Sequence, residues 1–100
     1  MTSRDELTAD EIEVIAARAE AASPGPWRAS IEGRDHLSGD TVILVGDRST
    51  DKAWDMYVWR DAGDGQRFAS EADLDFIAHA RQDIPLLITE VRRLRSERGL

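Results

Sequence analysis

The chain has 100 residues, of which 41% are hydrophobic and 33% are charged, and its formal net charge is −7. This length suits one domain around one hydrophobic core, so we expect residues 1–100 to form a single domain. The absence of cysteine excludes a disulfide framework, a thiolate metal site and a cysteine nucleophile. Surfaces that bind nucleic acid are usually basic, whereas this chain is acidic, so direct nucleic-acid binding is not expected.

Residues 1–13 are acidic and lack the basic and then apolar order of a secretory signal peptide. The longest stretch without a charged residue is 21–27, which is far shorter than the roughly 20 apolar residues of a membrane-spanning helix. We therefore expect a cytoplasmic protein that makes no contact with a membrane.

A first helix is predicted to begin after Thr8. Thr8 and Glu11 have the spacing of a capping box, in which each side chain bonds a free backbone amide at the helix start. The apolar stripe that follows has helical spacing and is mostly alanine; it consists of Ile12, Ile15, Ala16, Ala19 and Ala22. Pro24 ends the helix, and the stiff Pro24-Gly25-Pro26 segment is predicted to anchor Trp27 in the core.

Three strands are predicted in the middle of the chain. Residues 27–32 alternate between apolar and polar side chains, and residues 53–59 have large side chains on both faces. Residues 41–45 form a continuous apolar run, which is typical of a central strand covered on both faces. The connections are short, so an antiparallel meander is the simplest arrangement of the three.

The third predicted strand is the most informative for function. Its first face is formed by Trp54, Met56 and Val58. Its second face is formed by Asp55, Tyr57 and Trp59. A strand with one solvated face does not need two large aromatic residues there, so either helices cover both faces or the second face meets a partner. We predict that this second face binds protein, either a foreign partner or a second copy in a homodimer.

The rest of the chain is predicted to be a polar loop and two helices. Residues 60–69 contain Gly63 and Gly65 and are interpreted as the loop. One helix follows over residues 70–82, and another begins at Asp83 with Pro85 in its first turn. The predicted fold class is therefore α+β, with a helix, a three-stranded antiparallel meander and two C-terminal helices.

One group of side chains could support chemistry. Glu71, Asp75 and His79 are spaced four residues apart and therefore line one face of the helix over residues 70–82. A carboxylate beside an imidazole can bind a metal ion or exchange protons. The group lacks the His-Glu-x-x-His motif and a third ligand from another element, so a solvated helix face is the simpler interpretation. We expect no catalytic residue, no metal ion and no cofactor.

Two blocks of the sequence resemble a group of small phage and prophage proteins that includes the lambdoid Ead family. The first block, residues 12–27, ends in Ala-Ala-Ser-Pro-Gly-Pro-Trp. The second, residues 71–95, begins Glu-Ala-Asp-Leu-Asp-Phe-Ile-Ala-His-Ala-Arg. The resemblance implies a setting among phage accessory genes, in the cytoplasm of the host cell, and it assigns no catalytic or ligand-binding residue.

The sequence thus favours a non-enzymatic phage or prophage accessory protein that binds a protein, such as a host or defence factor. The main alternative is a module that binds a small molecule or a nucleotide signal. Two further alternatives are an inhibitor that mimics DNA and a weak metal-dependent hydrolase. Arginines interrupt the acidic residues, which disfavours the DNA mimic.

Overall fold

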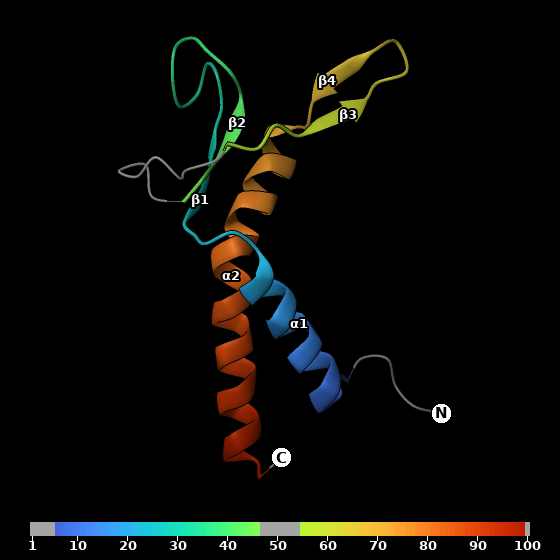
Figure 1. Cartoon of the computed structure of the whole chain (residues 1–100), viewed down its shortest axis with the longest axis vertical. Coiled ribbons are helices and arrows are strands. Elements are labelled where there is room, and N and C mark those ends of the chain that lie inside the picture. Colours follow the sequence, from blue (N-terminus) through green and yellow to red (C-terminus); the bar gives the residue numbers. More distant parts are fainter. Residues whose placement is uncertain (1–5, 47–54, 100) are drawn as a thin grey trace. The chain divides into compact units, whose positions relative to one another are not determined.

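The computed structural model of the chain describes residues 6–46 and 55–99. Its elements in chain order are α1 (Ala9–Ala21), β1 (Trp27–Ser30), β2 (Val42–Val45), β3 (Trp59–Asp61), β4 (Gln66–Phe68) and α2 (Glu71–Glu97) (Figure 1). The predicted α+β class is confirmed. The chain divides into two compact units, which we call the mixed unit (Ser23–Gln82) and the helical unit (the chain up to Ala22 together with the chain from Asp83 on).

α1 begins at the capping box that the sequence predicts. The Glu11 amide donates to Thr8 Oγ1 at 3.0 Å, and the Thr8 amide donates to Glu11 Oε1 at 2.9 Å. Ile12 is the buried residue of the helix. Within the helical unit α1 is held to α2 by an ion pair between Glu13 and Arg92 at 2.7 Å and by a hydrogen bond from the Arg95 guanidinium to the Leu7 carbonyl oxygen.

β1 and β2 form an antiparallel pair at the centre of the mixed unit, as predicted. Ala29 faces Ile43 in this register, and Ile43 is fully buried. The core also takes residues from the rest of the mixed unit; its buried members are Ala29, Ile31, Ile43, Val45, Ala69, Leu74 and Ala78. The predicted helix over residues 70–82 therefore supplies Leu74 and Ala78 to the core.

The predicted third strand over residues 53–59 is largely absent from the described residues. Its residues 53 and 54 lie outside the described ranges. Of residues 55–59, only Met56 pairs with β2, through an isolated antiparallel bridge in which it exchanges two hydrogen bonds of 2.9 Å with Ile43. This bridge lies on β2, as the predicted meander requires. The described residues do not continue it as a strand, because Trp59 pairs with Phe68.

β3 and β4 form a second antiparallel pair where the sequence predicts a polar loop. Gly63 and Gly65 have φ values of +87° and +136°, which favour glycine, and the Ala62 amide donates to the Gly65 carbonyl oxygen at 2.8 Å. The loop prediction over residues 60–69 is therefore wrong, because the two glycines form the turn of a β-hairpin. We call residues 59–68 the β3–β4 hairpin.

The two predicted C-terminal helices are one helix, α2, with Pro85 inside it. A proline in a helix removes one backbone donor, but it does not prevent helical geometry in the residues that follow. Ser70 caps the start as predicted, because its hydroxyl accepts a hydrogen bond of 3.1 Å from the Asp73 amide. The predicted break at Asp83 coincides with the boundary between the two units rather than with a helix end.

Trp27 packs against the core as predicted, but it is half-buried rather than largely buried. Gln82 of α2 holds its backbone: the Trp27 amide donates to Gln82 Oε1 at 2.9 Å, and Gln82 Nε2 donates to the Trp27 carbonyl oxygen at 3.1 Å. Arg81 adds a hydrogen bond of 2.9 Å from Nε to the Ser23 carbonyl oxygen. The start of β1 is therefore fastened to α2 by side chains rather than by a strand.

Replacing Gln82 with methionine is expected to destabilise the mixed unit. The change keeps most of the side-chain volume but leaves the part-buried Trp27 amide and carbonyl without partners, which costs about 1–3 kcal/mol. Chemical denaturation followed by circular dichroism measures the loss. Gln66→Met is the matched control, because Gln66 is exposed in β4. Equal unfolding midpoints for the two variants would show that the contact with Gln82 is dispensable.

Candidate functional site

The β3–β4 hairpin presents a pair of stacked aromatic rings. Trp59 and Phe68 face each other in the register of the two strands, and their ring centroids lie 4.2 Å apart with an angle of 17° between the ring planes. Trp59 is 49% exposed and Phe68 is half-buried. The rings therefore stack on each other, while much of the Trp59 ring still faces solvent.

Tyr57 is the second exposed aromatic residue of this region, at 48%. Its hydroxyl donates to Asp40 Oδ2 at 2.8 Å, which fastens the segment before β3 to the segment before β2. The hydrogen bond to Asp40 is the main cause that raises the pKa of Tyr57 above its usual value of 10.0, because ionisation would bring a phenolate against a carboxylate. We call Tyr57, Trp59 and Phe68 the aromatic surface.

The opposite face of the hairpin carries two arginines in register. Arg60 and Arg67 face each other across the strands, and like charges in such a position destabilise a sheet. Arg67 is partly neutralised by Asp64, with N–O distances of 3.1 and 3.2 Å. All three residues of β3 are exposed. The hairpin therefore combines a stabilising aromatic pair on one face with a destabilising arginine pair on the other.

The predicted protein-binding residues Asp55, Tyr57 and Trp59 are all exposed. They do not share the face of one strand, because only Trp59 lies in β3. Trp54, which belongs to the first face of the predicted strand, lies outside the described residues. Sequence reasoning missed Phe68, although its position across the Gly63–Gly65 turn from Trp59 is a signal of a hairpin pair.

The structure also places the residues that could have carried chemistry. Arg34, from the connection between β1 and β2, bonds both carboxylate oxygens of Asp75 at 2.8 and 3.1 Å and approaches Glu71 at 3.5 Å. The His79 Nδ1 lies 2.8 Å from the Asp75 carbonyl oxygen, so the ring N–H donates to the backbone of its own helix. The three residues of the predicted group all lie on α2, as expected. The carboxylates of Asp75 and Glu71, however, form ion pairs with Arg34.

Arg34 also determines the electrostatics of this cluster. Its hydrogen bond is the main cause that holds the pKa of Asp75 below the usual 3.8, and the same guanidinium lowers the pKa of Asp35. A carboxylate stabilised in this way is a poor general base near neutral pH. Across residues 6–46 and 55–99, no group of three or more histidine or acidic side chains could hold a metal ion.

In the described part of the chain, no helix is both long and apolar enough to cross a membrane. No family model, curated protein or solved structure matches this chain. Any functional assignment must therefore rest on the residues themselves, and the resemblance to Ead-like phage proteins stays a hypothesis.

The single tyrosine of the chain makes the Tyr57–Asp40 contact directly measurable. We expect its phenolate absorbance to titrate above pH 10, and Asp40→Asn to lower the midpoint because the carboxylate charge is gone. A folded pKa above the unfolded value means that the contact stabilises the fold below pH 10 and is lost as the pH rises through the folded pKa. Asp61→Asn, which changes another exposed aspartate, serves as the control; identical midpoints in both variants would rule out the contact.

Proposed function

We propose that this chain is a non-enzymatic protein-binding module whose binding site is the aromatic surface, with Asp55 beside it. The observation that carries the proposal is the stacked pair of Trp59 and Phe68, held on a hairpin whose first strand consists of three exposed residues. Tryptophan, tyrosine and phenylalanine are enriched in the cores of protein interfaces, because they contribute large contact areas and lose little side-chain entropy on binding.

The local energetics of the hairpin support a binding role. An isolated two-stranded hairpin is at best marginally stable in water. This one exposes an aromatic ring on one face and opposes two arginines on the other, although both features cost stability. Positions where a sequence violates the rules of local stability are often functional. A partner that covers the aromatic surface would recover the apolar area that the free chain leaves in water.

The chemistry of the hairpin indicates the kind of partner. An apolar side chain can pack on the Trp59 ring, and the two arginines favour acidic groups at the periphery. A two-stranded sheet also has a free backbone edge on each strand, which can accept an extended segment of a partner. We therefore infer a protein partner with an apolar anchor and acidic flanks.

The biological setting that we propose comes from the resemblance to Ead-like phage proteins. In that setting the chain is a phage or prophage accessory protein in the host cytoplasm, and the partner is a host or defence factor. The contacts of Arg34 with Asp75 and Glu71 support a non-enzymatic role, because they engage the carboxylates that a hydrolase would need.

The substitution Trp59→Asp is expected to abolish partner capture. The immobilised chain would be incubated with bacterial lysate, and specifically bound proteins would be quantified by mass spectrometry. A bound carboxylate would be desolvated against the apolar anchor, so recovery of the partner should fall at least about tenfold, the equivalent of about 1.4 kcal/mol. Leu37→Asp is the matched control, because Leu37 is an almost fully exposed apolar residue outside the hairpin.

Two outcomes would contradict the proposal. Equal recovery of every captured protein by wild type and Trp59→Asp would show that the aromatic surface binds nothing. A change from dimer to monomer in Trp59→Asp, without loss of any captured protein, would show that the aromatic surface joins two copies of the chain. Circular dichroism spectra must match between the variants, because only then does lost capture report on the surface rather than on folding.

A further inference from the structure

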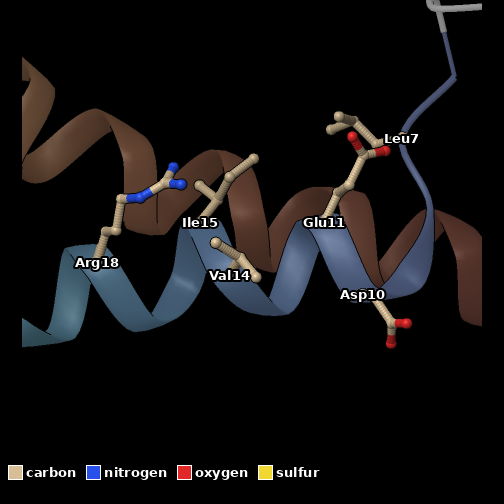
Figure 2. Close-up of a pocket in the computed structure, with 6 residues that line it drawn as sticks. All are labelled: Leu7, Asp10, Glu11, Val14, Ile15 and Arg18. Carbon is tan, nitrogen blue, oxygen red and sulfur yellow. The ribbon is translucent and has the colours of Figure 1, made fainter.

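We propose that the outer face of α1 joins two copies of this chain in an antiparallel, two-fold symmetric helix pair. The surface lies in the helical unit and is separate from the aromatic surface of the mixed unit. It is a groove lined by six residues: Leu7, Asp10, Glu11, Val14, Ile15 and Arg18 (Figure 2). Val14 and Ile15 lie at its middle, Arg18 lies at one end, and Leu7 lies with the two acidic residues at the other (Figure 2).

The apolar part of this groove is incompletely covered by its own chain. Val14 is 49% exposed and Leu7 is 40% exposed, whereas Ile12 on the neighbouring face is buried. The contacts of Glu13 and Arg92 belong to the side that packs against α2. Val14 and Ala21 are spaced by seven residues and therefore lie on one line along α1, whereas Leu7 precedes the N-cap Thr8.

Small exposed side chains follow Val14 along α1. In a two-fold interface a residue on the axis contacts its own counterpart. Away from the axis, if one residue contacts a second residue of the other copy, the reverse contact forms as well. If Val14 faces Val14 of a second copy in antiparallel orientation, Ala21 of one helix lies beside the N-terminus of the other. Ala17 and Ala21 are exposed and small, which allows the two helices to approach closely.

The charges of the groove are self-complementary in the same orientation. Asp10 and Arg18 each lie four residues from Val14, so Arg18 of one copy faces the acidic turn of the other. Within residues 6–46 and 55–99, neither the Asp10 nor the Arg18 side chain has a hydrogen-bond or ion-pair partner. A parallel arrangement would instead place like charges together. The charge pattern therefore selects an antiparallel second copy, and symmetry forms each favourable pair twice.

Sedimentation equilibrium of the full chain over a range of concentrations tests the proposal. Wild type is expected to dimerise reversibly. Arg18→Glu places like charges opposite each other twice, and Asp10→Arg weakens both pairs, so each should raise the dissociation constant roughly tenfold. Val14→Glu should give a monomer, because it would bury two unpaired charges at the two-fold axis.

The decisive measurement mixes two weakened variants. Arg18→Glu and Asp10→Arg are each poorly self-complementary but complement one another, so the mixture should form a heterodimer more tightly than either forms a homodimer. Arg28→Glu carries the same charge change on β1 and should leave the dimer intact. Circular dichroism must show equal helix content in all variants, since Asp10 and Arg18 also interact favourably with the helix dipole of α1.

Several results would overturn the proposal. The first is a wild-type chain that stays monomeric at the highest attainable concentration, which would leave the groove to a different protein. The second is a variant mixture that associates no better than its components. The third is a dimer that dissociates in Trp59→Asp but not in Val14→Glu, because this would show that the aromatic surface, and not α1, forms the dimer interface. Loss of partner capture in Trp59→Asp with an unchanged dimer would support both proposals independently.

Discussion

The hydrogen bonds between the Gln82 carboxamide and the backbone of Trp27 are the constraint on which the mixed unit depends. β1 has β2 on one side, and at Trp27 it needs a partner for backbone groups that water only partly reaches. The Gln82 carboxamide on α2 supplies both a donor and an acceptor. It therefore makes the backbone hydrogen bonds at Trp27 that a neighbouring strand would otherwise make. With this contact made, Leu74 and Ala78 on the same helix reach Ile43 in the core.

The same arrangement explains why the β3–β4 hairpin is available for binding. Among the described residues, β2 pairs with β1 and with Met56, whereas Trp59 pairs with Phe68 in the second sheet. Trp59, which alternation assigns to the third predicted strand, is instead carried on a hairpin whose first strand has three exposed residues. The rings of Trp59 and Phe68 stack on each other. A surface that the fold leaves uncovered is available to a partner.

Arg34 determines what the carboxylates of the Glu71, Asp75 and His79 group can do. Glu71, Asp75 and His79 have helical spacing, and that spacing by itself is compatible with metal binding or with proton transfer. Arg34 is distant in sequence and bonds both carboxylate oxygens of Asp75. The pair stabilises the ionised carboxylate and connects the β1–β2 connection to α2. Sequence spacing could not reveal this contact, because it depends on where the connection between the strands folds back.

The sequence by itself determined the elements whose signals are local: the capping box of α1, the strands β1 and β2, and the start of α2. These depend on periodicity and on contacts within a few residues. Only the tertiary structure decided that residues 55–59 do not extend as a third strand of the first sheet, that Phe68 joins the candidate site and that Gln82 anchors β1. These features depend on contacts between distant segments, where pairing and burial override local preference.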